Sequence, residues 1–278
     1  MVAKVSTRTV PLFLLLALTS CGQDRSDHLY TASAFVTGQD ERYRADGIAA
    51  CLPLVLVKVS GDPTLLSDPR VPALASTAGA FVASIEYRDR MAGIPIGDEQ
   101  GTRDRPYDLS VKFKQSQIDV ALRSLGREPW RGQRPVVAAF IGVNNHGRTY
   151  VLSNDQDLGL DQRAALTEAA DAVGVPLELP TASRVAADGV TAQALLNGQL
   201  SAALAAKTIG SGAVLIGSMT WNTGDIGWRA DWRFNWNHIP HHWTIRDVNF
   251  DEAFRIAMRG AARIMSGHGE PASADEPQ

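Results

Sequence analysis

Apolar and polar residues alternate along several stretches of the chain, which is the pattern of strands with one buried face. The clearest stretch is GWRADWRFNW, residues 227–236, whose apolar members Trp228, Ala230, Trp232, Phe234 and Trp236 fall on one face. Residues 29–38, 84–87, 107–113 and 243–250 also read as strands, and the apolar run 136–143 suits a strand buried on both faces. The pattern therefore predicts strands in both halves of the chain.

Helical spacing separates these strands. Ile48, Leu52, Val55, Leu56 and Val59 share one face of a helix predicted over residues 41–60. Further helices are predicted over residues 69–81, 116–125, 161–173 and 191–207. The last helix begins at Asn249 as its cap, with Glu252 at the third position. We expect this helix to carry an apolar stripe of Phe250, Phe254, Met258, Ala261 and Met265.

Alternating strands and helices predict an α/β (α+β) fold of two small domains. The second domain should contain an antiparallel, tryptophan-rich meander and a C-terminal helix. The expected organisation is a signal peptide (1–20), a tether (21–29), an N-terminal domain (30–126), a linker (127–135), a C-terminal domain (136–265) and a disordered tail (266–278). The linker is placed where breaker residues gather, in GREPWRGQRP.

The N-terminus has the pattern of an export signal. Lys4 and Arg8 precede an apolar run that is too short to span a bilayer as a helix. The sequence LTSC, which ends at Cys21, resembles the lipobox of bacterial lipoproteins, whose cysteine is acylated. The resemblance implies a protein anchored to the lipid bilayer through Cys21. Gly22 after the cysteine favours the outer membrane, facing the periplasm.

Composition narrows the classes of partner. The net charge is −3, and no long basic tract is present, so we expect no binding to nucleic acid. Cys51 is the one other cysteine, and its apolar helical surroundings favour a small buried residue over a nucleophile.

The region richest in candidate chemistry is the end of the tryptophan-rich meander. Trp228, Trp232 and Trp236 could form a glycan-stacking platform, but the pattern favours a core beneath the last helix. His238, His241 and His242 would converge on a helix, whereas strand alternation runs into them and Pro240 is expected at the bend. We therefore expect a polar hairpin tip, with no metal and no cofactor. These six residues are the predicted ligand or partner surface.

A further resemblance rests on several short motifs. They are VKVSGD (57–62), YDLSVKF (107–113), Trp130 with Arg134-Pro135, and GWRADW (227–232). Together they resemble the bacterial domain-of-unknown-function family number two-thousand-and-sixty-six, a set of exported proteobacterial proteins. That family has no established activity or catalytic residues, so the resemblance carries none over to this chain.

These observations favour a non-catalytic envelope lipoprotein that acts by protein–protein contact in envelope assembly or maintenance. Its expected partner is another envelope protein. The alternative is a periplasmic glycan-binding module or metal-dependent enzyme built on the tryptophan–histidine hairpin.

Overall fold

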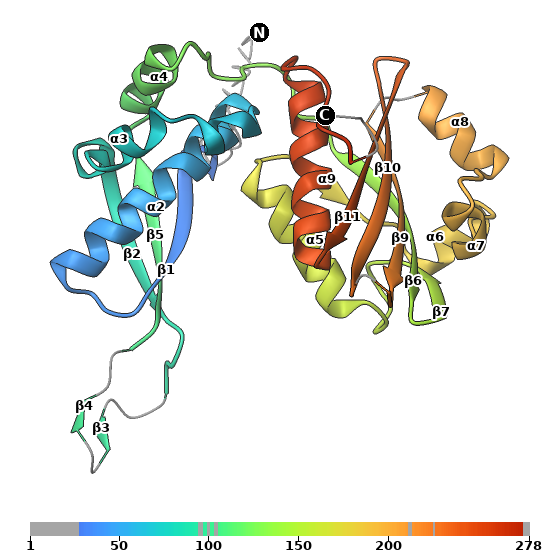
Figure 1. Ribbon diagram of the computed structural model, residues 1–278, viewed down its shortest axis with the longest axis horizontal. Helices are drawn as coiled ribbons and strands as arrows, with labels where there is room; N and C mark the ends of the chain where they lie inside the picture. The colour runs from blue at the N-terminus through green and yellow to red at the C-terminus, as the bar shows by residue number, and fades with distance from the viewer. Residues whose placement is uncertain are drawn as a thin grey trace, which may run out of the picture.

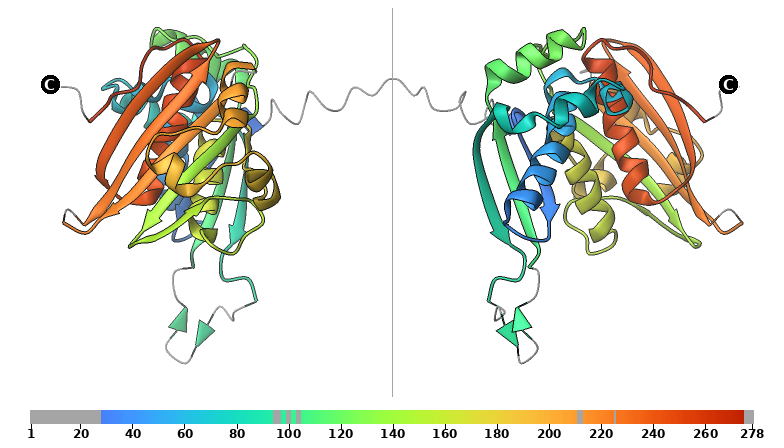
Figure 2. Two further views of the ribbon diagram at one scale, coloured as in Figure 1. Left: turned by 90° about the vertical axis from the view of Figure 1, so that its right-hand side faces the viewer. Right: turned by 60° about the vertical axis from the view of Figure 1, so that its left-hand side comes forward.

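The computed structural model describes residues 28–93, 97–98, 101–102, 105–210, 213–224 and 226–274. These residues form a mixed α/β fold, which confirms the predicted fold class. Each half of the chain contributes one main sheet with helices against it, and the halves meet at one end (Figure 1). A small hairpin, β3 (Gly97–Asp98) and β4 (Gly101–Thr102), projects beyond the first sheet at the end away from this joint (Figures 1 and 2).

The first half is a three-stranded antiparallel sheet in the order β1-β5-β2. Its strands are β1 (Thr31–Val36), β2 (Val82–Asp89) and β5 (Tyr107–Phe113). Helix α2 (Glu41–Ser60) packs on one face and has the bounds that the apolar spacing predicts. Helix α4 (Gln115–Ser124) packs beside α2.

The second half is a mixed sheet in the order β11-β10-β9-β6-β7, with β8 paired to β6. Its strands are β6 (Val137–Asn145), β7 (Arg148–Val151), β8 (Leu177–Glu178), β9 (Val214–Asn222), β10 (Gly227–Trp236) and β11 (Ile239–Val248). Strands β6 and β9 run parallel, whereas β9, β10 and β11 form the predicted antiparallel meander.

Helices cover both faces of the second sheet unequally (Figure 1). Helices α5 (Leu160–Ala172) and α9 (Phe250–Met265) pack together, and α9 packs on β10 and β11. On the other face α6 (Ala182–Ala187), α7 (Ala192–Leu196) and α8 (Ala202–Gly210) lie beside β6 and β9, over a smaller apolar cluster. The tryptophan face of β10 therefore meets α9 in the main core.

Two predicted helices are shorter and broken. Instead of one helix over 191–207, α7 ends at Leu196 and α8 starts at Ala202, because Gly198 takes a left-handed backbone (φ 72°) between them. Instead of one helix over 69–81, there are α3 (Val71–Ala75) and a 3₁₀ turn, Ala78–Phe81. Here the Thr77 hydroxyl donates to the carbonyl of Leu74 and competes with helix continuation.

The bend of the β10–β11 hairpin lies elsewhere than predicted. Asn237 and His238 form the turn, with φ of 50° and 65°, and Pro240 pairs with Asn235 inside β11. Positive φ at both central residues is the geometry of a two-residue hairpin turn. Proline is tolerated in β11 because that strand is at the edge of the sheet.

The described part of the predicted disordered tail is ordered. Residues 266–274 return along β11, where the amide of Ala274 donates to the carbonyl of Thr244. Ser273 accepts a hydrogen bond from the Thr244 amide, and Glu270 pairs with His241. The tail therefore covers the open edge of β11, which composition alone did not indicate.

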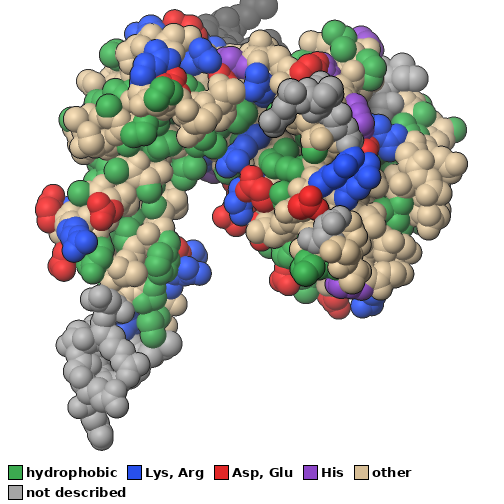
Figure 3. Space-filling model, in the orientation of Figure 1, with side chains coloured by type: hydrophobic (Ala, Val, Ile, Leu, Met, Phe, Trp, Pro, Cys, Tyr) green, Lys and Arg blue, Asp and Glu red, His purple; other side chains and the backbone are tan. Residues whose placement is uncertain are grey.

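The joint between the halves is closely packed. Buried side chains of both halves belong to one connected apolar cluster, and the backbone amide of Trp130 donates to the carbonyl of Val59. Below the joint the halves separate, which Figure 3 shows as a gap between two lobes. Within the described residues no helix is both long enough and apolar enough to cross a bilayer.

Candidate functional site

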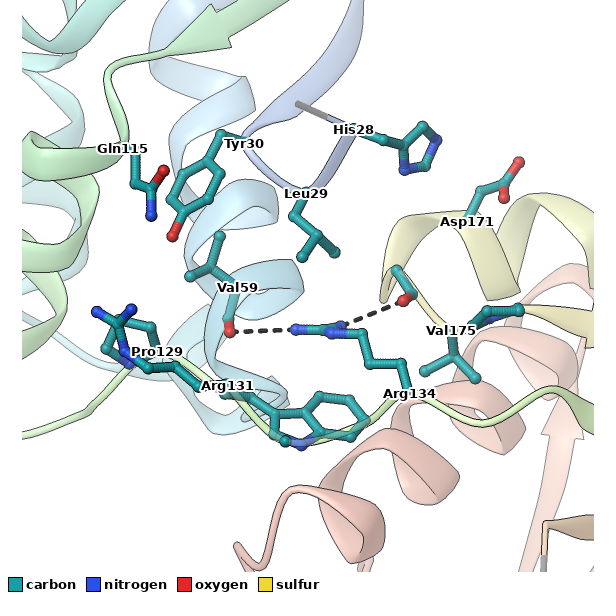
Figure 4. Close-up of a pocket in the computed structure, with 14 residues that line it drawn as sticks. His28, Leu29, Tyr30, Val59, Gln115, Pro129, Arg131, Arg134, Asp171 and Val175 are labelled. Carbon is teal, nitrogen blue, oxygen red and sulfur yellow. Dashed lines mark hydrogen bonds between the residues drawn. The ribbon is translucent and has the colours of Figure 1, made fainter. Parts of the chain in front are cut away.

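A pocket of about 560 Å³ lies at the joint and takes residues from both halves (Figure 4). We call it the joint pocket. Its lining residues come from the start of the described chain, the ends of α2 and α5, the first residue of α4 and the segment 127–135: His28, Leu29, Tyr30, Val59, Gln115, Pro129, Trp130, Arg131, Gly132, Arg134, Asp171, Gly174, Val175 and Pro176. Because His28 lines it, the joint pocket lies where the chain arrives from Cys21, seven positions earlier.

Arg134 joins the two halves at this pocket. One terminal nitrogen donates to the carbonyls of Val173 (3.0 Å) and Gly174 (3.2 Å), just beyond the end of α5. The other donates to the carbonyls of Lys58 (2.8 Å) and Val59 (3.2 Å), in the last turn of α2. Carbonyls at helix C-termini lack partners within the helix, and the helix dipole favours a cation there. A single guanidinium thus satisfies two helix ends.

The surroundings of Arg134 are partly apolar. Its guanidinium lies 4.1 Å from the centre of the Trp130 ring, a cation–π contact. Burial lowers the pKa of Arg134 to about 10. At neutral pH the side chain therefore still carries its charge.

The second wall of the joint pocket is a hydrogen-bonded trio. The Tyr30 hydroxyl donates to the Asp119 carboxylate at 2.9 Å, and Arg131 donates to the other oxygen at 3.2 Å. Burial, followed by the hydrogen bond to Asp119, raises the pKa of Tyr30 to about 12. Tyr30 is therefore a fixed neutral donor at physiological pH.

The third wall is formed by His28 and Asp171, with Lys58 close to both. Lys58 is almost fully buried and donates to the carbonyl of Thr31 at 3.1 Å. Burial lowers the pKa of Lys58, and the charge of Asp171 opposes that shift. Burial and the nearby Lys58 charge lower the pKa of His28.

The side chains of the joint pocket form a clasp, by which we mean that they bond one half of the molecule to the other. Its arginines, its tyrosine and the nearby Lys58 already bond within the protein, and the lining contains no serine, threonine or cysteine. The arrangement holds the halves together close to the predicted tether.

The predicted tryptophan surface is largely interior. Trp232 is fully buried against Phe254 of α9, and Trp228 is buried against Trp221. Trp236 is half-buried beside the same cluster. The preference for a core over an external platform is thus confirmed for Trp228 and Trp232, because buried rings cannot stack on a glycan.

The three histidines of the hairpin do not converge. His238 is exposed in the turn, His241 pairs with Glu270, and His242 lies 3.0 Å from an Asp231 oxygen. No three His, Cys, Asp or Glu side chains gather as a metal-ligand set within the ranges that the structure describes. Cys21 and the predicted signal peptide lie outside the described residues. Cys51 is fully buried, and burial raises the pKa of its thiol to about 12.

Among the residues that the structure describes, no helix covers one face of the first sheet, and sequence reasoning did not single this face out. We call it the open face. Its residues alternate with those that face α2: Ser33 and Phe35 on β1, Glu86 and Arg88 on β2, and Asp108, Ser110 and Lys112 on β5. Phe35 is 56 % exposed although it is a large apolar side chain. Alternation within YDLSVKF was the signal that this sheet has a second, polar face.

Charges surround Phe35 on the open face. Arg88 donates to Asp108 at 2.6 Å, and Arg90 lies 3.7 Å from the other oxygen of the same carboxylate. The Arg90 guanidinium also lies 5.5 Å from the centre of the Phe35 ring. Two arginines thus share one carboxylate beside an exposed aromatic ring.

Comparison with known proteins corrects the family resemblance drawn from the motifs. No match is found among curated proteins or among solved structures. The resemblance to family two-thousand-and-sixty-six is wrong: short motifs in the right order occur outside that family too. The family model that matches is a domain of unknown function, DUF8605, over residues 25–131, which is less than half of the chain and spans the first sheet, its helices and part of the segment 127–135.

Proposed function

We propose that this protein is an envelope lipoprotein, anchored through Cys21, that acts by contact with another envelope protein. The observation that carries the proposal is the open face, where Phe35 is exposed among charged residues. Aromatic and arginine side chains supply most of the binding energy in protein interfaces. Phe35, Arg88 and Arg90 therefore have the chemistry of an interface centre.

The charges of the open face suggest the chemistry of the partner. Arg88 and Arg90 share the single carboxylate of Asp108. Two guanidinium groups have more N–H donors than one carboxylate can accept, so a carboxylate from another protein could bind the remaining donors. Phe35 would enter an apolar recess on the same partner. The partner surface is thus acidic, with a hydrophobic pocket.

Anchoring supports this mode of action. Residues 22–27 separate Cys21 from His28, and that length reaches only about 20 Å when fully extended. The joint pocket therefore stays near the lipid, and both lobes act within a short distance of the membrane. Mass spectrometry of the mature N-terminal peptide tests the anchor: a diacylated or triacylated Cys21 is expected, and a free thiol at the mature terminus contradicts it.

Affinity purification from detergent-solubilised membranes tests the contact. Phe35→Ser should lose the co-purifying protein, because it removes the exposed ring and keeps the strand. The matched control is Val120→Ser, since Val120 is 55 % exposed on α4, away from the open face. If both variants recover the same protein equally, the open face is not the surface that binds it.

A further inference from the structure

A second pocket, of about 630 Å³, lies in the second half of the chain, and we call it the end pocket. It is found where the parallel strands β6 and β9 end, at Asn145 and Trp221, beside the first turns of α5 and α9. In α/β sheets ligands bind outside the carboxyl ends of parallel strands. Figure 1 places these strand ends away from the joint.

The wall of the end pocket is aromatic. The ring of His146 lies 5.1 Å from that of Trp221, tilted by 36°, and Trp221 meets Trp228 edge-on at 5.7 Å. Tyr150 and Phe250 also line the pocket. Trp228 is buried behind this wall, so Trp221 and His146 offer the flat apolar surface to a ligand that has flat apolar faces of its own.

His146 lies in the two-residue turn between β6 and β7. Its φ is 51°, in the left-handed region that asparagine and glycine adopt more readily. Gly147, with φ of 84°, completes the β6–β7 turn. This turn places the His146 ring beside Trp221 at the edge of the end pocket.

The floor of the end pocket is polar and uncharged, and its rim is acidic. Gln162 is 5 % exposed, and its Oε1 accepts from the Tyr150 hydroxyl. Among the described residues none accepts a hydrogen bond from its Nε2, which leaves amide donors for a ligand. Asp157 and Asp161 are exposed at the rim, and neither lysine nor arginine is among the lining residues.

We propose that the end pocket binds a neutral saccharide ring. A sugar has apolar C–H faces for Trp221 and His146, and hydroxyls that donate to carboxylates and accept from the Gln162 amide. An anion is disfavoured, because Asp157 and Asp161 repel it. An organic cation is less suited, because Asp161 lies in the first turn of α5, where the helix dipole already offsets its charge. The proposal is independent of the open face.

Isothermal titration calorimetry of the purified mature chain tests this site. The probes are a tetramer of N-acetylglucosamine, a tetramer of glucose, and choline as an organic cation. We expect binding of at least one oligosaccharide. His146→Gly should weaken it at least fivefold, because the ring is lost while glycine suits the backbone of the turn. Asp157→Ala, at the exposed rim, should weaken it as well.

The matched control is His238→Gly. His238 is also an exposed histidine with positive φ, but it lies at the other end of β10, so its removal should leave affinity unchanged. Circular dichroism would show that each variant is folded. The proposal is overturned if the wild-type chain binds neither oligosaccharide, if choline binds in their place, or if both His146→Gly and Asp157→Ala bind the sugar as tightly as wild type.

Discussion

Single side chains decide how the two halves are held. Arg134 gives four hydrogen bonds to backbone carbonyls beside the ends of α2 and α5, and its ring contact with Trp130 fixes the guanidinium plane. A lysine has one nitrogen and cannot reach two helix ends at once. The identity of this residue, beyond its charge, is therefore what the joint requires.

Arg134→Lys should lower the free energy of unfolding by about 2 kcal/mol, because at least two carbonyls lose a charged donor. Urea unfolding followed by tryptophan fluorescence measures the change. Arg123→Lys is the control, since Arg123 is half-exposed and lies 3.8 Å from Glu128 in a surface pair of small energy. Equal stability of the two variants would show that Arg134 is not a clasp.

This residue-level role could not be predicted from the sequence. The carbonyl partners of Arg134 lie 39 to 76 positions away along the chain, and no periodic pattern connects them. In contrast, Asn249 was predicted as the cap of α9, and its side chain accepts from the Glu252 amide at 2.8 Å. Capping is a contact over three positions, so the local sequence contains it.

At the scale of elements, β9 and β10 pack closely where Gly217 of β9 lies opposite Trp232 of β10. A Cβ on Gly217 would lie 2.4 Å from Cζ3 of Trp232 and 3.2 Å from Ile141. The space beside this glycine is thus filled by the indole ring. The core beneath α9 depends on this fit as well as on its apolar content.

Gly217→Ala should therefore destabilise the chain by about 1–3 kcal/mol through overpacking. Thermal unfolding measures it. Gly224→Ala is a suitable control, because the nearest atom to its added Cβ is Oδ1 of Asn222 at 3.4 Å. If Gly217→Ala unfolded at the same temperature as this control, the space beside Trp232 would be large enough for the added Cβ, and the prediction would be wrong.

The tail makes a second prediction at this scale. Removing residues 268–278 should destabilise the chain by about 1–2 kcal/mol, because the hydrogen bonds of Ser273 and Ala274 to Thr244 are lost. It should also promote self-association, since the edge of β11 becomes free to pair. Removing only 275–278 keeps these bonds and is the control. Sedimentation velocity measures the association state of each chain. A truncated chain that stays monomeric would contradict the expected self-association.

Local patterns predicted elements well where one face meets the core and poorly where a turn decides. The alternation in 227–236 and the spacing in 41–60 gave β10 and α2 with their observed bounds. The break between α7 and α8 depends on Gly198, whose carbonyl accepts from Arg233 of β10 at 2.7 Å. That contact comes from a distant strand, so helical spacing over 191–207 could not reveal it.

At the scale of the whole molecule, we expect two histidines at the joint to make its stability sensitive to acid. Burial lowers the pKa of His28 and of His268; the Lys58 charge adds to the effect at His28, and Arg127 and Arg263 add to it at His268. Asp171 and Asp62 oppose these shifts. Below the ordinary histidine pKa of about 6.5 the unfolded chain binds protons that the folded chain does not.

The free energy of unfolding should therefore fall as the pH is lowered from 7.5 to 5.5. Urea unfolding at both pH values measures the slope. The double variant His28→Gln, His268→Gln should show a flatter slope, because its side chains do not titrate in this range. An unchanged slope would assign the acid sensitivity to other groups.

The arrangement of the two halves was only partly readable from sequence. Breakers in 127–135 marked the boundary between sheets, yet they do not show that Trp130 and Arg134 fasten this segment to α2. The open face and the end pocket were missed for a similar reason. Each gathers residues from several elements, and only the fold brings them together.

The most direct test of the proposed function is photo-crosslinking in intact cells from the open face. Benzoylphenylalanine in place of Phe35 keeps an aromatic ring on β1, and the same probe in place of Val120 is the control. We expect a discrete adduct with another envelope protein from position 35 alone, and its loss when Cys21→Ala removes the anchor. No adduct from position 35, or the same adduct from both positions, would contradict the account.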